Sequence, residues 1–440
     1  MSMDLDLSFY KENIQKARTF QLDGRVTDVV GLLIEALGPA VSVGELCKIE
    51  NIHGQEIFAE VVGFRGKKVL LMPYSEMSGI GPGCRVMSTG APMSVMIHDG
   101  YMGRVINGLA QPLDGKPLDQ KGKLYSIYRE SFHPLRRKRI DEPVATGIKS
   151  IDSCLTLGKG QRIGIFSGSG VGKSILMGMI ARNTSAEVNV IGLIGERSRE
   201  VREFLEKDLK EEGLSRSVVV VVTSDLPALQ RIKGLFVATT LAEYFREQGK
   251  DVMLMIDSVT RFAMAQREVG LAVGEPPATK GYTPSVFAML PKILERAGRS
   301  DTGSITGLYT VLVEADDFNE PISDAVRSVT DGHVMLTREL AQRGHYPAVD
   351  LLQSTSRVMI DIVEKEHMKC AEEIKKVIAT YREAEDLINI GAYVKGSNPG
   401  IDYAIQMISR VNDFLTQGID ERFTYQETLQ KLKGLFTKTP

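Results

Sequence analysis

Short apolar segments separated by glycine-containing turns fill residues 21–92. Residues 29–34, 59–64 and 69–72 are the clearest of these segments, and they are rich in Val, Ile, Leu and Phe. Apolar runs of this length, bounded by turn residues at short intervals, are typical of strands in small antiparallel sheets. The pattern predicts a small all-β domain in residues 21–92, closed into a barrel.

Longer apolar runs alternate with helical segments in residues 93–360. The runs are residues 162–166, 188–193, 218–223, 252–256 and 305–313. Strands that are covered on both faces are apolar at nearly every position, whereas strands with one exposed face alternate between apolar and polar residues. The pattern therefore predicts an α/β domain in which a parallel sheet is flanked by helices.

The strands stop after about Met359, and helical periodicity takes over in residues 361–440. Apolar residues recur there at spacings of three and four: Met368, Ala371, Ile374, Val377, Ile378, Tyr381, Ala384 and Leu387. This spacing predicts an amphipathic helix. A break rich in Gly, Asn and Pro covers residues 391–400, and residues 401–415 have the pattern of a second helix. We expect a helical C-terminal domain.

Residues 1–20 form a separate N-terminal segment with sparse apolar positions at loosely helical spacing. Two interpretations stay open: a frayed terminal helix, or a helix that docks on a partner. The expected fold is therefore α/β, with a parallel-sheet core in residues 93–360, a small β-barrel before it and a helical domain after it.

Composition adds few constraints to this picture. A chain of 440 residues suggests two or three domains, and 43% hydrophobic and 25% charged residues are typical of globular proteins. The 54 Lys and Arg residues nearly balance the 56 Asp and Glu residues, which argues against a nucleic-acid carrier. No secretion signal, membrane-spanning run or C-x-x-C pair is found in the sequence. We expect a cytoplasmic protein.

Residues 162–181 have the strand–loop–helix pattern of a phosphate-binding loop. The loop consists of Ser167, Gly168, Ser169, Gly170, Val171, Gly172, Lys173 and Ser174. Its glycines let backbone N–H groups converge on phosphate oxygens, and the start of the following helix adds positive potential. Lys173 is predicted to reach the β- and γ-phosphates of ATP, and the Ser174 hydroxyl to bind Mg²⁺. Ser167 stands where the usual pattern has its first glycine.

Three further positions are candidates for the chemistry of hydrolysis. Asp257 ends an apolar strand, where a carboxylate can hold the water shell of Mg²⁺ beside the phosphate loop. Glu196 and Arg197 follow another such strand, so they could orient the attacking water or simply begin a surface helix. Arg357 lies in a polar turn, in which an isolated arginine is usually structural. The residues alone leave the roles of Glu196, Arg197 and Arg357 open.

Ordered motifs along the chain resemble the catalytic subunits of rotary ATPases. The resemblance runs from about Gly24 to Thr416, and within that superfamily it is strongest to the ATPases of flagellar and type III protein export. The motifs are residues 103–105, 112–115, 146–152, 158–162, the phosphate loop, 195–197, the strand ending at Asp257, 274–282, 346–350 and 354–357.

This resemblance implies roles for the ambiguous residues. Glu196 would orient the attacking water, with Arg197 in the same site. Arg357 would be an arginine finger, given across a subunit boundary to the γ-phosphate of the neighbour. Tyr346 would stack on adenine. Phe423 would be the C-terminal companion of Tyr346, in an alignment that needs a gap.

The resemblance also implies a function and partners. Residues 274–285 and 387–399 look like those of flagellar export ATPases, so we expect a homohexameric ring that hydrolyses Mg·ATP to energise export. The expected partners are a dimeric regulator that docks on residues 1–20, a coiled-coil rod in the pore, chaperone–cargo complexes and a membrane export gate at the inner face of the cell membrane. No specific nucleic acid is expected. The alternatives are a virulence-secretion ATPase, an RNA-translocating hexamer and a non-catalytic ring subunit.

Overall fold

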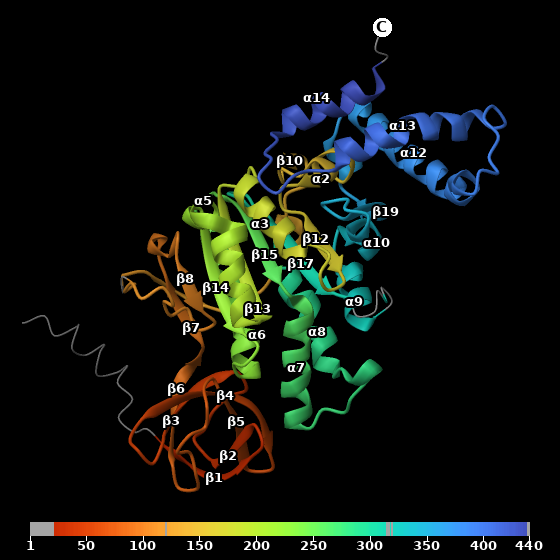
Figure 1. Cartoon of the computed structure of the whole chain (residues 1–440). Helices are drawn as coiled ribbons and strands as arrows, with labels where there is room; N and C mark the ends of the chain where they lie inside the picture. Colours follow the sequence, from red (N-terminus) through yellow and green to blue (C-terminus); the bar gives the residue numbers. More distant parts are fainter. Residues whose placement is uncertain (1–21, 119–120, 314–316, 318–319, 438–440) are drawn as a thin grey trace, which may run out of the picture. The chain divides into compact units, whose positions relative to one another are not determined.

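The protein is described from a computed structural model of the whole chain, drawn in Figure 1. The structure describes residues 22–118, 121–313, 317 and 320–437. The chain divides into two compact units, with the boundary between Met93 and Ser94. Residues 1–20, predicted either to fray or to dock on a partner, lie outside the described residues.

The first unit is a closed barrel of six strands in the order β1-β2-β5-β4-β3-β6. Its strands are β1 (Gly24–Val30), β2 (Leu33–Leu37), β3 (Glu45–Glu50), β4 (Glu56–Arg65), β5 (Lys68–Pro73) and β6 (Arg85–Pro92). All neighbouring pairs are antiparallel. The predicted barrel is therefore present.

The interior of the barrel is filled by the apolar side chains that alternate along its strands. In β3, Cys47 and Ile49 are buried, and the residues between and beside them are partly exposed. This period of two is expected where one face of a strand meets the core. The apolar segment 29–34 is a hairpin and not one strand, because β1 ends at Val30 and Gly31 turns the chain with a φ of 59°.

The second unit is built on a largely parallel sheet. Its strands run in the order β19-β18-β12-β17-β15-β13-β14-β8, and only β19 in this row is antiparallel to its neighbour. They are β8 (Val105–Asn107), β12 (Arg162–Ser167), β13 (Val188–Glu196), β14 (Ser217–Thr223), β15 (Asp251–Asp257), β17 (Ser304–Leu312), β18 (Gly332–Leu336) and β19 (Val349–Ser356). A short strand, β16 (Gly298–Arg299), pairs with β17.

Helices cover both faces of this sheet (Figure 1). One face carries α6 (Ala228–Glu247) and α7 (Val259–Val273), which contact β13, β15 and β17. The other face carries α3 (Lys173–Asn183), whose Leu176 and Ile180 share a core cluster with Ile191 and Leu193 of β13. Because successive residues of a strand point to opposite faces, the near-continuous apolar runs are explained by burial on both sides.

The remaining elements of the central part lie between these strands and helices along the chain, and four of them form two separate two-stranded sheets, β7 with β9 and β10 with β11. They are β7 (Ser94–Ile97), β9 (Lys123–Ser126), β10 (Pro143–Val144), α2 (Lys149–Cys154), β11 (Leu157–Gly158), α4 (Ser198–Glu203), the π-helix η3 (Phe204–Leu209), α5 (Lys210–Ser215), α8 (Pro284–Leu294), α9 (Pro321–Val329) and α10 (Arg338–Gln342). Three single turns of 3-10 helix complete the set: η1 (Asp99–Tyr101), η2 (Pro134–Arg136) and η4 (Thr279–Gly281).

The C-terminal part is helical, as predicted. Its helices are α11 (Met359–Ile362), α12 (Lys365–Asn389), α13 (Pro399–Leu415) and α14 (Tyr425–Phe436). Helices α12 and α13 form a hairpin whose tip extends away from the sheet (Figure 1). The helices α12, α13 and α14 also contribute buried side chains to the core cluster that contains α3. Examples are Ile374 of α12, Val411 of α13 and Leu432 of α14.

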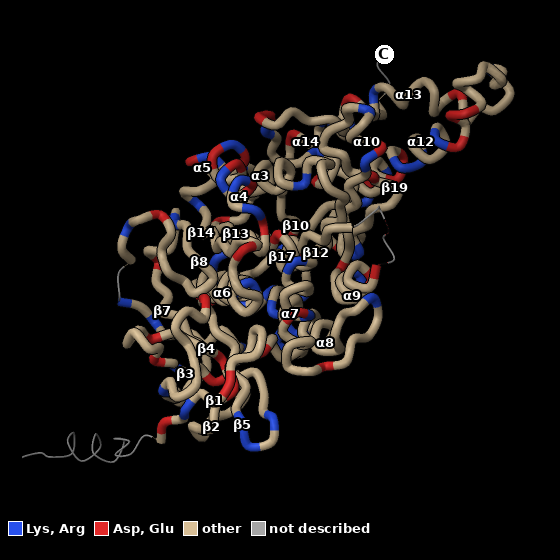
Figure 2. Tube along the Cα trace, turned by 60° about the horizontal axis from the view of Figure 1, so that its bottom comes forward, with Lys and Arg blue, Asp and Glu red and all other residues tan. Residues whose placement is uncertain are grey.

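Charged residues of both signs are mixed along the chain (Figure 2). The segment from α4 to α5 shows this most clearly, because Arg199, Arg202 and Lys207 pair with glutamates one helical turn away. Among the described residues, no helix is long and apolar enough to cross a membrane.

Candidate functional site

The phosphate-binding loop joins the end of β12 to the start of α3. Gly172 is the residue before α3 and has a φ of 90°, a left-handed conformation that glycine adopts without strain. Among the described residues no side chain caps the start of α3, so its first N–H groups remain available to a ligand. A helix start of this kind, preceded by a glycine-rich turn, is suited to phosphate.

Ser167 occupies the last position of β12, where the usual pattern has glycine. The residue is fully buried, and its carbonyl accepts a hydrogen bond of 2.9 Å from the N–H of Val313. Its φ does not lie in the left-handed region, so this position does not need a glycine. The loop therefore keeps its shape although the sequence motif is incomplete.

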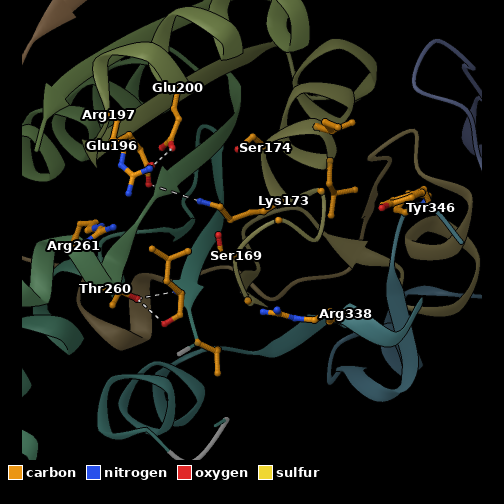
Figure 3. Close-up of a pocket in the computed structure, with 18 of the residues that line it drawn as sticks. Ser169, Lys173, Ser174, Glu196, Arg197, Glu200, Thr260, Arg261, Arg338 and Tyr346 are labelled. Carbon is orange, nitrogen blue, oxygen red and sulfur yellow. Dashed lines mark hydrogen bonds and ion pairs between the residues drawn. The ribbon is translucent and has the colours of Figure 1, made fainter. Parts of the chain in front are cut away.

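The phosphate-binding loop opens into a cavity of about 1110 Å³ in the second unit. Figure 3 shows Lys173 directed toward Glu196 on one side of this cavity and Tyr346 on the other side of the loop. Tyr346 is 42% exposed, and beside it lie Pro347 and residues 416–419. A partly exposed aromatic ring in a cavity wall can stack on a nucleobase, while the opposite end offers charged groups to phosphates.

Lys173 connects the loop to two carboxylates. Its ammonium forms an ion pair with Asp257 Oδ1 and lies 3.8 Å from Glu196 Oε1. Asp257 is 3% exposed, and its Oδ1 also accepts a hydrogen bond of 2.7 Å from the Thr310 hydroxyl. The ends of β13 and β15 are adjacent in the parallel sheet, which is why Glu196 and Asp257 meet at the same edge.

Glu196 is the carboxyl group whose ionisation the site affects most. Burial, together with the negative charges of Asp257 and Glu200, raises its pKa to about 7, and the Lys173 ammonium opposes this shift. Among the described residues no donor hydrogen-bonds to its Oε1 atom. A buried acceptor that points into a cavity is suited to hold a water molecule.

Arg261 is a site residue that the sequence interpretation missed. It lies in the first turn of α7, four positions after Asp257, and it lines the cavity. Its side chain packs against Gly195, where a Cβ atom would lie only 2.7 Å from the Arg261 Cβ. The φ of Gly195 is 75°, so both its conformation and this close approach require glycine. In the sequence, the position of Arg261 four residues after Asp257 was the one feature that could have indicated a place in the site.

Other cations that line the cavity were also missed, and they come from widely separated elements. These are Arg267 of α7, Lys280 of η4 and Arg338 of α10, in addition to the predicted Arg197. Lys280 pairs with Asp317 at 3.1 Å. Together these cations give the cavity the positive potential that a triphosphate needs.

Arg357 lies where the parallel strands β12 and β18 begin, whereas the phosphate-binding loop lies where β12 ends. The two are therefore at opposite edges of the sheet, measured along the strands. Ser356 ends β19 opposite Gly332, the first residue of β18, and β18 runs parallel to β12. The strand β12 advances five residues from Arg162 to Ser167, which corresponds to roughly 17 Å at ~3.3 Å per residue. The described residues that line the cavity do not include Arg357.

Phe423 is also not among the residues that line the cavity. Its ring lies 4.8 Å from the ammonium of Lys149 and 5.1 Å from that of Lys431. The C-terminal contribution to the cavity wall comes from residues 416–419 instead, which sequence reasoning did not single out. Gln417 holds them, because its amide bonds to the N–H of Lys149 and the carbonyl of Gly147, both at 2.8 Å.

Comparison with known proteins places this geometry in a family. Residues 147–356 match the nucleotide-binding domain of the ATP synthase alpha/beta family, and residues 26–90 match the β-barrel domain of the same family. Residues 363–434 match the T3SS EscN ATPase C-terminal domain. The chain is 53% identical to the flagellum-specific ATP synthase of Bacillus subtilis over 424 residues, which cover 96% of this chain and 97% of the relative.

The chain belongs to the ATP synthase alpha/beta family. Among solved structures of this family, the assembled ATPase EscN from the type III secretion system of enteropathogenic E. coli is 46% identical, with a TM-score of 0.88 over 94% of this chain and 99% of EscN. A structure of EscN with its central stalk EscO matches with 46% identity and a TM-score of 0.87 over the same shares of the two chains. These matches confirm the predicted fold class, the resemblance to export ATPases and the prediction of an ATP-hydrolysing enzyme.

The oxygen-bearing side chains of Ser174 and Asp257 fit a magnesium ion that binds together with the nucleotide. Ser174 lines the cavity with a hydroxyl, and Asp257, which is not among the lining residues, lies against Lys173 with its carboxylate; both groups are oxygen ligands of the kind that Mg²⁺ prefers. Within the described part of the chain, no group of three or more His, Cys, Asp or Glu is arranged to hold a metal. A hard cation at Ser174 and Asp257 would therefore complete its shell with phosphate and water oxygens.

Proposed function

We propose that this chain is the ATPase of a flagellar protein export apparatus, hydrolysing Mg·ATP at the subunit interfaces of a homohexameric ring. The observation that carries this proposal is the separation of the phosphate-binding loop from Arg357. With the two at opposite edges of one sheet, roughly 17 Å apart along β12, Arg357 cannot reach its own cavity. It can serve the cavity of a neighbouring copy.

The residues of one cavity account for binding and for holding the water. Backbone N–H groups of residues 168–174 and the Lys173 ammonium bind the phosphates, and Tyr346 stacks on the base. Glu196 accepts a hydrogen bond from the water that attacks the γ-phosphorus. As the water oxygen bonds to the γ-phosphorus, the bond from that phosphorus to the bridging oxygen breaks, and ADP leaves together with phosphate, which carries the protons of the water. Ser174 and Asp257 would hold the magnesium ion that accompanies ATP, and that ion would supply positive charge beside the phosphate oxygens.

The neighbouring subunit completes this site with Arg357. A guanidinium that reaches the γ-phosphate from another chain stabilises the charge that develops during transfer, an effect on the order of 10³ to 10⁵ in rate. The Arg357 side chain is exposed, and among the described residues no partner is found for its guanidinium. An isolated subunit is then a poor enzyme, and assembly activates it.

Flagellar export is favoured over virulence secretion by two kinds of observation. Residues 274–285 and 387–399 resemble those of flagellar export ATPases, and the 53% identical relative from Bacillus subtilis is named a flagellum-specific ATP synthase. Virulence secretion is the alternative, since EscN belongs to a type III secretion system and shares the fold. Genes for rod, hook and basal-body proteins beside the gene for this chain would favour the first role, and effector genes the second.

One proposed partner is supported by a solved structure of a relative, and the others follow from the family resemblance alone. The structure of EscN with its central stalk supports a coiled-coil rod in the pore of a ring of this chain. A dimeric regulator on residues 1–20, chaperone–cargo complexes and an export gate at the cytoplasmic face of the membrane complete the proposal. An RNA-translocating motor receives no support from the distribution of charged residues, because Lys and Arg are mixed with Asp and Glu along the chain (Figure 2).

Replacement of Arg357 tests this function. We expect Arg357→Ala to lower kcat by about 10³-fold or more while nucleotide affinity stays within a few-fold, because the residue lies outside its own cavity. Lys173→Ala is the matched control, and it should weaken nucleotide binding as well as hydrolysis. Activity per subunit should also fall on dilution below the concentration at which rings form.

Two results would contradict the proposal. One is a loss of nucleotide binding by the isolated Arg357→Ala chain, which would place the residue in its own cavity. The other is a specific activity that stays constant on dilution to monomers, which would show that one chain contains the complete site.

A further inference from the structure

A compact hydrogen-bond network surrounds the backbone of Arg357 at the edge of the sheet opposite the phosphate loop. The N–H of Arg357 donates to the carbonyl of Asp331 at 3.0 Å. Asp331 immediately precedes β18, and Ser356 ends β19, so the two residues lie side by side where these strands meet. The position of Arg357 therefore depends on where Asp331 is held.

Arg162, the first residue of β12, holds Asp331. The Arg162 backbone N–H and Nε atom donate to Asp331 Oδ2 at 3.0 and 3.1 Å, and Nη2 donates to Oδ1 at 3.0 Å. Arg162 is only 14% exposed in its side chain and also pairs with Glu295 at 2.5 Å. A bidentate guanidinium–carboxylate pair in a partly buried place fixes both groups in orientation as well as distance.

Gln161 holds the other side of the same turn. It is fully buried, and its Oε1 accepts from the N–H of Gly158 at 2.8 Å. Its Nε2 donates to the Ser356 hydroxyl at 3.0 Å and to the Asp331 carbonyl at 3.3 Å. The Ser356 hydroxyl in turn donates to the carbonyl of Thr156 at 2.9 Å. Ser356, which precedes Arg357, and the Asp331 carbonyl, which accepts from the Arg357 N–H, therefore both accept hydrogen bonds from the buried side-chain amide of Gln161.

The network holds the backbone of Arg357 and leaves its side chain free. No described residue accepts a hydrogen bond from the Arg357 guanidinium or forms an ion pair with it, whereas the side chains of Gln161, Asp331 and Ser356 are all hydrogen-bonded. An arginine that was purely structural at this place would be expected to use its donors within the chain. A fixed backbone with a free guanidinium suits a side chain that acts on another molecule.

We propose that Asp331, supported by Arg162 and Gln161, is a positioning residue that places Arg357 for hydrolysis in the neighbouring subunit. The proposal rests on the function proposed above. Asp331 is not among the described residues that line the cavity of its own chain, and its contribution to the neighbouring site is through the geometry of Arg357. A displacement of about 1 Å in a catalytic group can cost about 10²-fold in rate.

Asp331→Asn is the variant that tests this inference, since it keeps the size of the side chain and removes its charge. We expect kcat to fall on the order of tenfold to 10²-fold, with KM for ATP and nucleotide binding within about twofold. Asp301→Asn is the matched control, because Asp301 has a side chain that is 79% exposed and lies 3.9 Å from Lys138. The control should leave kcat unchanged.

Mixed rings separate a positioning role from a general loss of structure. Asp331→Asn chains keep an intact phosphate loop, and Lys173→Ala chains keep an intact Arg357 and its support. In rings that contain both, the Asp331→Asn site receives a correctly placed Arg357 from its neighbour. The ATPase activity of the mixture should exceed the sum of the two variants measured separately. Arg357→Ala mixed with Lys173→Ala should show the same gain.

The two mixtures distinguish failure of this inference from failure of the proposed function. A gain with Arg357→Ala but none with Asp331→Asn would overturn the positioning role and leave the interface site intact. No gain with either variant would overturn the action of Arg357 across the interface, and this inference with it. Should Asp331→Asn fail to fold, Ser356→Ala removes the link between Gln161 and Thr156, and the same mixtures must show a gain.

Discussion

At the scale of single residues, Glu196 shows how the site changes the chemistry of a side chain. A carboxyl group that is buried beside Asp257 and Glu200 loses part of the hydration that stabilises its charge. Its pKa of about 7 places the change between the two forms near neutral pH. Only the ionised form accepts hydrogen bonds with both oxygens, so the ability of the site to hold water depends on pH.

The rate of hydrolysis should therefore depend on the ionisation of Glu196. Because the folded-state pKa is raised, the carboxylate predominates above pH 7 and is lost as the pH falls through that value. We expect kcat to approach a tenfold decrease for each pH unit below about 7. The measurement is kcat at saturating ATP from pH 5.5 to 9, with ring assembly checked at each pH.

Glu196→Gln is the companion variant for this measurement. It should have little activity at any pH, because an amide cannot take the place of the carboxylate. A flat profile for the unmodified protein from pH 5.5 to 9 would remove Glu196 from the rate-limiting chemistry.

At the scale of elements, the packing of α3 against the π-helix η3 requires a glycine. A Cβ atom on Gly178 would lie 2.6 Å from the Cβ of Asp208 and 2.8 Å from its backbone. Such contacts are shorter than real ones, so the two helices would have to separate. Since α3 begins at the phosphate-binding loop, this packing supports the site as well as the core.

Gly178→Ala should lower the free energy of unfolding by about 1–3 kcal/mol, the usual cost of forcing extra volume into a packed place. Urea denaturation measures this change. Gly434→Ala is the matched control, because Gly434 lies in α14 and a Cβ there meets no atom within 4 Å. Alanine in an open helical position should stabilise by about 0.5–1 kcal/mol. Equal effects of the two substitutions would contradict the steric argument.

The elements also show why some of the site could be predicted and some could not. The phosphate-binding loop was recognised because a strand, a glycine-rich turn and a helix start follow one another directly along the chain. The support of Arg357 was not, because Arg162 and Asp331 are 169 positions apart and only the fold brings them together. The same is true of Gln417, which bonds to residues 268 and 270 positions away.

The helices also differ in how clearly the sequence predicts them. The pattern of α12 predicted it because one face is exposed and polar while residues such as Ala371 and Ile374 are buried. The helix α6 carries no comparable signal, since it is buried along nearly its whole length and includes the buried polar residues Lys233, Glu243 and Arg246. A helix that is covered on all sides lacks the period of 3.6 residues on which such predictions depend.

At the scale of the whole molecule, a buried ion pair ties the segment before the nucleotide-binding core to α6. Arg296 and Glu243 are both at most 3% exposed and are joined by hydrogen bonds of 2.9 and 2.7 Å. Arg296 also donates to the carbonyl of Ile127 at 2.8 Å and to the Thr240 hydroxyl at 3.0 Å. One side chain thus joins three distant parts of the second unit.

Arg296→Met should destabilise the second unit by about 3–5 kcal/mol, because Glu243 would remain buried without its main counter-charge. The double variant Arg296→Met/Glu243→Leu should recover part of this loss. Arg202→Met serves as the control, since its pair with Glu206 is 79% and 60% exposed and should contribute less than about 1 kcal/mol. A double variant less stable than Arg296→Met would mean that Glu243 is favourable even without the arginine.

The placement of the phosphate-binding loop and Arg357 at opposite edges of the sheet restricts the symmetry of any active assembly. In a two-fold dimer one surface patch meets itself, so both sites are complete only if that single patch contains the cavity as well as Arg357. Head-to-tail contacts make no such demand, because they join two different surfaces and give the assembly a direction. An open row always leaves one cavity at its end without an arginine, whereas a closed ring leaves none. Closure is therefore the step that completes the last site.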